Sequence, residues 1–157
     1  MVSGRERRNI AVNRRIRYDF NIINTYEVGI VLKGTEVKSL RAGHCSLQDA
    51  HCKFLNKDSL ELYVYHFHIN LYEQGNIQNH DPKRPKKLLL NYRELKKIKN
   101  SVMEKGIILM PLSVYFSGHL VKLELALCTS KRKYDKREAK KEREAKIEIE
   151  RRFKVRY

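Results

Sequence analysis

The 157-residue chain has few acidic residues, few cysteines and no long apolar run. No stretch approaches the roughly 18 to 20 apolar residues of a membrane-spanning helix, so no span is predicted, and a membrane is not the partner we expect. Residues 1–15 are charged and lack an apolar centre, which argues against a secretory signal. Gly-rich phosphate loops, G-x-S-x-G and H-E-x-x-H strings are also missing. These absences indicate a cytoplasmic protein that is not an enzyme.

The three cysteines, Cys45, Cys52 and Cys128, form no C-x-x-C pair. An odd number without metal-ligand spacing is typical of reduced thiols in the cytosol. The histidines lack the fixed spacing of a zinc site as well. We therefore expect neither a bound metal nor any other cofactor.

Charge of one sign dominates, because 34 Lys and Arg face 18 Asp and Glu and give a net charge of +16. Most of the excess lies at the two ends: residues 1–17 carry +5, residues 131–157 carry +7, and the middle keeps +4. Such a balance is typical of a protein with a polyanionic partner, nucleic acid first and an anionic membrane surface second.

The middle of the chain has the pattern of a domain made of short strands. Aromatic and β-branched residues predict one long strand or two consecutive strands over 18–32. Two strand pairs follow, 51–55 with 60–67 and 107–116 with 120–127. Hairpin connections favour an antiparallel barrel over a parallel sheet. The fold class we predict is mainly β: an oligonucleotide-binding (OB-type) Greek-key barrel flanked by short helices.

Two helices are predicted at the edge of this barrel. One covers 35–41, with Thr35 as its cap and Gly43 as its stop. The other covers 92–105, after Asn91. Gly and Pro residues predict a loop over 70–87.

The C-terminal segment differs in kind from the domain. It has helix-favouring charge pairs and no Gly or Pro, yet it cannot bury enough apolar surface to fold alone. We therefore expect a flexible basic arm at 1–12, the barrel at 13–130, and a basic tail at 131–157 that is disordered until a partner makes it helical.

The first candidate for nucleic-acid contact is Asn13-Arg14-Arg15 with Tyr18. Arginine forks suit phosphates, an Asn amide reads a base edge, and a Tyr ring stacks on an exposed base. A solvated arm before the first strand is the alternative interpretation.

The second candidate is the short helix over 35–41. There Lys38 and Arg41 face a ligand, and Glu36 orients an arginine by a bidentate pair. The alternative is a helix that merely closes one end of the barrel.

Two basic clusters complete the candidates, each with a solvated charged surface as its alternative. The Pro-stiffened loop is a candidate phosphate clamp, and the start of the tail interleaves charge with an aromatic ring, as RNA-binding surfaces do. The clamp residues are Lys83, Arg84, Lys86 and Lys87, and the tail residues are Lys131, Arg132, Lys133, Tyr134, Asp135, Lys136 and Arg137.

Three strings carry a resemblance to a known family: TYEVGIVLKGTEVKSLRAG at 25–43, YEQGNIQNHDPKRPKKLLL at 72–90 and YDKR at 134–137. The chain resembles the small protein B family, the SsrA-binding proteins of bacterial trans-translation. The resemblance implies a barrel that binds the tRNA-like domain of transfer-messenger RNA (tmRNA). It also implies a tail that enters the empty message channel of a stalled ribosome, past the decoding centre of the small subunit.

By position, the resemblance implies an RNA-binding face and a ribosome-engaging tail. The face comprises Asn13, Tyr18, Glu27, Leu89 and Lys122, and the tail comprises Lys131, Lys133 and Asp135-Lys136-Arg137. The chain departs from the usual pattern at Arg14, where a lysine is usual, and at Thr129 and Ser130, where Lys-Gly is common.

The function we predict is a monomeric RNA-binding adaptor of trans-translation. The residues leave two alternatives open: a general single-stranded RNA or DNA-binding module with the same barrel, and a nuclease whose carboxylate or histidine centre has no recognisable motif.

Overall fold

The computed structural model of the protein describes residues 6–154. Its strands are β1 (Arg7–Val12), β2 (Phe20–Ile30), β3 (Cys45–Ser46), β4 (His51–Phe54), β5 (Leu62–Tyr65), β6 (His68–Ile69), β7 (Lys86–Leu89), β8 (Ile107–Ser117) and β9 (Leu120–Ser130). Its helices are α1 (Arg14–Asp19), α2 (Gly34–Arg41), α3 (Tyr92–Val102) and α4 (Lys133–Lys154), with a 3-10 turn η1 at Asn76–Gln78. None of the helices within residues 6–154 is long and apolar enough to cross a membrane.

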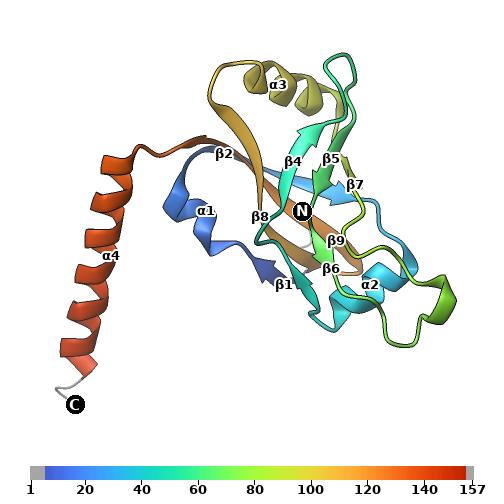
Figure 1. Ribbon diagram of the computed structural model, residues 1–157, viewed down its shortest axis with the longest axis horizontal. Helices are drawn as coiled ribbons and strands as arrows, with labels where there is room; N and C mark the ends of the chain where they lie inside the picture. Colours follow the sequence, from blue (N-terminus) through green and yellow to red (C-terminus); the bar gives the residue numbers. More distant parts are fainter. Residues whose placement is uncertain (1–5, 155–157) are drawn as a thin grey trace.

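Six strands close an antiparallel ring in the order β8-β4-β5-β7-β2-β9, because β9 pairs again with β8 (Figure 1). The edge of β8 opposite β9 is shared: β4 pairs at Leu109, and β1 pairs from Ser113 to Ser117. The short strands β3 and β6 form a separate pair. Ring closure leaves few free strand edges. The predicted fold class, an antiparallel barrel flanked by helices, is confirmed.

The core fills the inside of the barrel with alternate residues of each strand. Leu62 and Val64 of β5 are fully buried, as are Leu123 and Leu125 of β9. Helices α2 and α3 lie at different ends of the barrel (Figure 1) and bury Leu40 and Ile98 in the same core. Burying each such side chain contributes about 1.5–3 kcal/mol, so both helices are fixed parts of the domain.

The flexible arm predicted at 1–12 is wrong for Arg7–Val12, which form β1 and pair with β8. Ile10 and Ala11 pack against the core, and this burial holds the strand in place. Residues 1–5 lie outside the described range.

Helix α1 then takes the place of the predicted start of the first long strand. Ile16 of α1 is buried in a second, smaller core cluster with Leu112 and Ala126. This apolar contact stabilises the six-residue helix α1, which the periodicity of the sequence alone does not indicate.

The second helix begins one residue earlier than predicted, at Gly34, so Thr35 is not its cap. Instead the Lys33 backbone N–H donates to Glu36 Oε2 at 2.7 Å. Gly43 follows α2 in the left-handed region, with φ of 77°, as its predicted role as a stop requires. The predicted loop over 70–87 ends early, because Lys86 is the first residue of β7.

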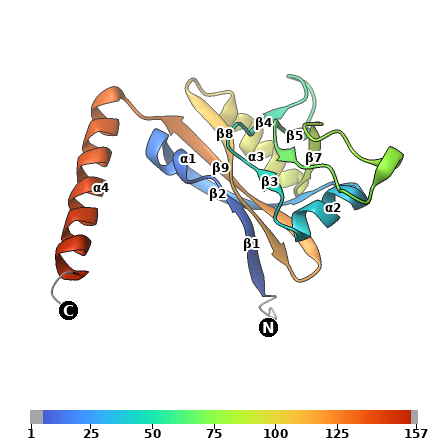
Figure 2. The same cartoon turned by 60° about the horizontal axis from the view of Figure 1, so that its bottom comes forward.

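The tail is a continuous helix, α4, that projects away from the barrel (Figures 1 and 2). The sequence predicted a tail that is disordered until a partner makes it helical; the structure has this helix, and disorder of the free tail stays a prediction. The absence of Gly and Pro and the i,i+4 pairs Glu148–Arg152 (2.7 Å) and Lys140–Glu144 (3.9 Å) favour a helix even without tertiary packing. Residues 155–157 lie outside the described range.

Candidate nucleic-acid interface

Strand register brings three of the expected RNA-face residues together on the outside of the barrel. Gly29 of β2 pairs with Leu89 of β7 on one side and with Lys122 of β9 on the other. Glu27 lies two residues before Gly29, so its side chain projects from the same face of β2. Leu89 is 52% exposed, and any Cβ at Gly29 would approach the Leu89 Cβ to 3.3 Å. We call this surface of Glu27, Leu89 and Lys122 the sheet face.

The Glu27 carboxylate is held in place by two neighbours. The Tyr115 hydroxyl donates to Oε2, and Lys122 Nζ lies 3.7 Å from Oε1. Burial, and then this hydrogen bond, raises the pKa of Tyr115 above its usual range, so the hydroxyl keeps its proton at neutral pH. The Glu27 side chain is still 59% exposed, which leaves a fixed acceptor open to a ligand.

Strand β1 extends the sheet face with Arg7. Its guanidinium carbon lies 3.9 Å from the centre of the Tyr115 ring, and Nη2 donates to Ser113 Oγ at 3.1 Å and to Glu124 Oε2 at 3.2 Å. Sequence reasoning missed Tyr115 and Glu124. The signal was available, because each lies two residues from another polar residue of the same strand and so on the same face.

The predicted bidentate pair of Glu36 exists, and its partner is Arg84. Arg84 Nε donates to Oε1 at 2.8 Å and Nη2 to Oε2 at 2.7 Å. The Glu36 side chain is fully buried, so it cannot touch RNA directly. Its role is to join α2 to the loop before β7.

The predicted phosphate clamp is divided by burial. Lys86 is fully buried, and its Nζ donates to the carbonyls of Phe67 and Arg84, both at 2.9 Å. Burial lowers the pKa of Lys86 to about 8, although the nearby Glu36 opposes this effect. The prediction is therefore wrong for Lys86, because the period of two in β7 turns it toward the core.

The other clamp residues keep some access to solvent. Lys83 is exposed, whereas the Lys87 ammonium lies 2.9 Å from Glu61 Oε1. Arg84 is partly exposed beside its pair with Glu36. Two lysines and one fixed guanidinium therefore remain on this side of the domain.

Helix α1 presents its arginines but not Asn13. The Asn13 side chain is buried, and Nδ2 donates to the Leu47 carbonyl at 3.0 Å. The prediction that Asn13 reads a base edge is therefore wrong, because its amide already joins the start of α1 to the loop after β3. Arg14 and Arg15 are exposed, and Tyr18 is half-buried.

Helix α2 leaves its two basic residues open to solvent, and their contact with a ligand stays a prediction. Lys38 and Arg41 are both exposed. The Lys38 ammonium lies 5.2 Å from the centre of the Tyr72 ring, while Leu40 between them points into the core.

Contacts with α1 hold the tail against the barrel, and they include a backbone hydrogen bond from the Lys131 N–H to the Asp19 carbonyl at 3.1 Å. Lys131 Nζ donates to the Arg17 carbonyl at 3.1 Å, and Lys136 Nζ lies 3.6 Å from Asp19 Oδ1. Arg132 N–H donates to Asp135 Oδ2 at 3.3 Å and so caps the first turn of α4. These contacts fix where the tail leaves the domain.

The remaining tail residues named by the sequence divide into two groups. Arg137 is exposed on α4, and the side chains of Lys133 and Tyr134 lie outside the described part of the structure.

Thr129 and Ser130, which replace the usual Lys-Gly pair, belong to β9 and pair with Asn21 and Phe20 of β2. The strand therefore continues to the residue before the tail.

The closed antiparallel ring and its charged outer face define a small barrel of the oligonucleotide-binding type. The family described as SmpB protein matches residues 10–155, and the chain belongs to this family.

Relatives from three bacteria share its length. "SsrA-binding protein" from Carboxydothermus hydrogenoformans is 47% identical over 94% of this chain and 97% of its own length. Its counterpart from Acetivibrio thermocellus is 48% identical over 95% of both chains, and that from Pelotomaculum thermopropionicum is 47% identical over 94% of both.

A solved structure is similar as well. A chain described under "tmRNA-SmpB: a journey to the center of the bacterial ribosome" has 43% sequence identity and a TM-score of 0.64. The match covers 82% of this chain and 92% of that one.

Proposed function

We propose that this protein is an RNA-binding adaptor of trans-translation, without catalytic turnover, that acts in the cytoplasm. Its barrel binds the tRNA-like domain of tmRNA, and its tail engages the small subunit of a stalled ribosome along the empty message channel. One observation carries the proposal: strand register gathers Glu27, Leu89 and Lys122, three residues that the sequence resemblance led us to expect at RNA, into one sheet face.

The sheet face has the chemistry that a folded RNA requires. Lys122 supplies positive charge for phosphates, and exposed Leu89 supplies an apolar surface for a base or a ribose. The Glu27 carboxylate accepts hydrogen bonds from base amino groups or ribose hydroxyls. Because Tyr115 holds Glu27 in place, the face is organised before RNA arrives.

Further positive charge surrounds the sheet face and the helices. In this proposal the surrounding residues contact the RNA backbone and contribute affinity more than specificity. They are Arg14, Arg15, Lys38, Arg41, Lys83 and Lys87, with Tyr18 as a stacking ring.

The tail suits a long, narrow RNA channel. Its 22 helical residues extend about 33 Å, and the side chains described in α4 beyond its first turns are almost all exposed. Such a helix carries positive charge away from the barrel without burying an apolar surface of its own.

Binding to two RNAs tests the proposal against a general single-strand-binding module. We expect the protein to prefer a tRNA-like tmRNA fragment over an unstructured RNA of the same length at both low and moderate salt. Equal affinities with equally steep salt dependence would contradict the adaptor role, because counterion release alone would then explain binding.

A matched pair of variants tests the sheet face itself. Glu27→Ala should weaken binding of the tRNA-like fragment while the melting temperature stays close to that of the wild type. Glu104→Ala, which removes an exposed carboxylate after α3, should leave binding unchanged. A large loss of stability in Glu27→Ala would mark Glu27 as structural instead.

Truncation separates the two parts. A chain that ends at Ser130 should keep most of its affinity for the tRNA-like fragment and lose rescue of stalled ribosomes. Loss of RNA binding on truncation would contradict the division between barrel and tail.

A further inference from the structure

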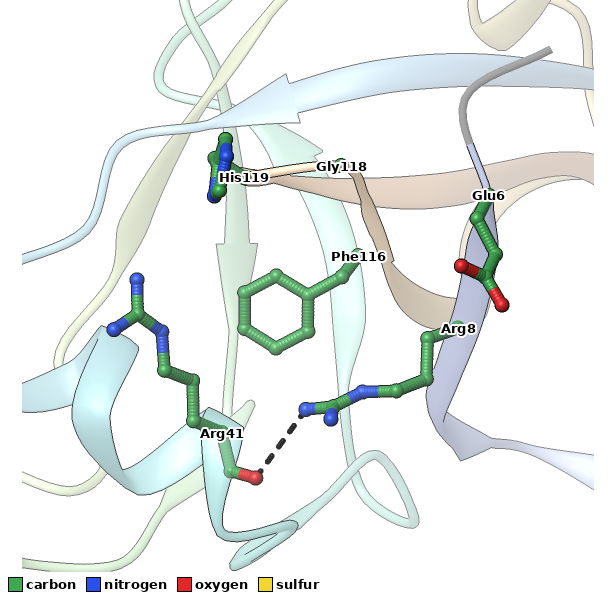
Figure 3. A pocket seen from close by; sticks show the side chains of 6 residues that line it. All are labelled: Glu6, Arg8, Arg41, Phe116, Gly118 and His119. Atoms are coloured by element: carbon green, nitrogen blue, oxygen red, sulfur yellow. Dashed lines mark hydrogen bonds between the residues drawn. The ribbon is translucent and has the colours of Figure 1, made fainter.

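A groove on the opposite side of β1 from the sheet face is lined by positive charge that the sheet face does not use. It lies between β1, the end of α2 and the turn from β8 to β9, and has a volume of about 560 Å³. Figure 3 shows the six lining residues, Glu6, Arg8, Arg41, Phe116, Gly118 and His119, around the Phe116 ring.

Strand alternation explains how β1 serves both sides. Arg7 turns outward to Tyr115, so its neighbour Arg8 turns the other way. Arg8 pairs in register with Phe116, and its guanidinium carbon lies 5.2 Å from the centre of that ring. Its Nη2 donates to the Arg41 carbonyl at 3.3 Å, the bond drawn in Figure 3.

The second guanidinium comes from α2. Arg41 is the last residue of this helix, and its side chain enters the groove from the side opposite Arg8 (Figure 3). His119 follows Gly118, whose φ of 63° makes the tight turn that places the imidazole at the rim. Three nitrogen-bearing side chains from three parts of the chain therefore surround one apolar ring.

The two guanidinium groups lack the carboxylate partners that other basic side chains have. Within residues 6–154, neither Arg8 nor Arg41 has a carboxylate within 4 Å. Arg7, Arg84 and Lys122 each have one. Glu6 also lines the groove, but its carboxylate pairs with neither guanidinium. Two like charges that share a groove and are not ion-paired favour a bound anion, and a planar guanidinium donates two parallel hydrogen bonds to a phosphate.

We propose that this groove binds a backbone phosphate of RNA, held by Arg8 and Arg41, with His119 at the rim. The inference rests on the proposed function, since it takes RNA as the partner. Because β1 has the sheet face on one side and the groove on the other, an RNA strand that crosses β1 reaches both. The groove thus extends the RNA-binding surface around the edge of the barrel.

The test is the salt dependence of binding for Arg8→Gln, Arg41→Gln and the double variant. Arg93→Gln is the control, since Arg93 is an exposed arginine of α3. Each variant is titrated at several salt concentrations with the tRNA-like fragment of tmRNA and, separately, with small ribosomal subunits. Removal of a phosphate contact should weaken binding about tenfold and lower the salt slope by about 0.7–0.9.

The two arms distinguish the source of the phosphate. A lower slope with the tRNA-like fragment identifies tmRNA, and a lower slope only with subunits identifies ribosomal RNA; either result supports the site. Unchanged slopes in both arms, with Arg93→Gln also unchanged, would overturn it. Because Arg8 also bonds the backbone of α2, the double variant's urea midpoint is compared with that of the wild type, and Arg41→Gln alone keeps the test valid if the double variant unfolds.

Should the wild type show no preference for the folded RNA, the proposed function fails instead. That result is separate, because it is read from the wild type and not from the groove variants.

Discussion

Replacing Glu36 with Gln should destabilise the fold far more than loss of one surface charge. The buried carboxylate accepts from the Lys33 backbone N–H at 2.7 Å and from Arg84 at 2.8 and 2.7 Å. Lys86 Nζ lies 3.9 Å away and is fully buried. The amide keeps the shape but turns an NH₂ group toward these donors and leaves two cations without a counter-charge.

The size of the effect follows from the burial of each partner. Breaking a buried ion pair by removing one partner costs about 3–5 kcal/mol. The Arg84 side chain is 22% exposed, so water relieves part of its charge, and we expect about 3 kcal/mol. For a chain of this length that corresponds to a fall in melting temperature of about 6–12 °C.

Urea unfolding of Glu36→Gln and Glu61→Gln measures the difference. Glu61 is the matched control, because it pairs with Lys87 at a similar distance, 2.9 Å, while both side chains are more than 40% exposed. That pair should contribute at most about 1 kcal/mol. An unchanged m-value with a lower midpoint for Glu36→Gln would locate the loss in the folded state. Equal losses in the two variants would refute the reasoning from burial.

Three further predictions concern other contacts. In thermal melts, the free energy of unfolding of the wild type minus that of Lys86→Met should increase from pH 7 to pH 9. The folded-state pKa of Lys86, about 8, lies below its ordinary 10.5, so the wild type gains stability as pH rises through this range; a constant gap would contradict it. Tyr115→Phe should free the Glu27 carboxylate and weaken binding of the tRNA-like fragment several-fold, while chemical denaturation shows a loss of no more than about 1 kcal/mol. Lys136→Ala should remove the contact with Asp19 and broaden the distances between labels on α4 and the barrel without changing the melting temperature, and an unchanged distribution would show that the contact does not orient the tail.

The barrel was predictable because its signal is local and repeated. Period-two patterns and hairpin turns give the strands over 107–127 within a few residues, and hydrophobic burial confirms them. Strand β1 was not predictable in the same way. Its six residues include two arginines and an asparagine, and only pairing with β8, about a hundred residues away, makes them a strand.

The candidate site was predictable only in part, and for a physical reason. The bidentate partner of Glu36 could be expected by type but not named, because Arg84 is 48 residues away. Tyr115 was missed because strand alternation indicates the face on which it lies but not its partner, and Phe116 beside it is aromatic as well. Its role depends on register with β2 and β9, which places Glu27 within reach of its hydroxyl.

Neighbouring basic residues have different destinations because a strand alternates its faces. Lys86 is fully buried, while Lys87 beside it faces solvent; Arg7 joins the sheet face, and Arg8 enters the groove. A count of positive charges therefore overstates the RNA-binding surface, since some of those charges hold the loops and helices of the barrel in place. Charge identifies the class of partner, whereas the alternation of side chains along each strand decides which of them can contact that partner. Strand β1 shows this most clearly, because its six residues supply one arginine to each of two surfaces that face different directions.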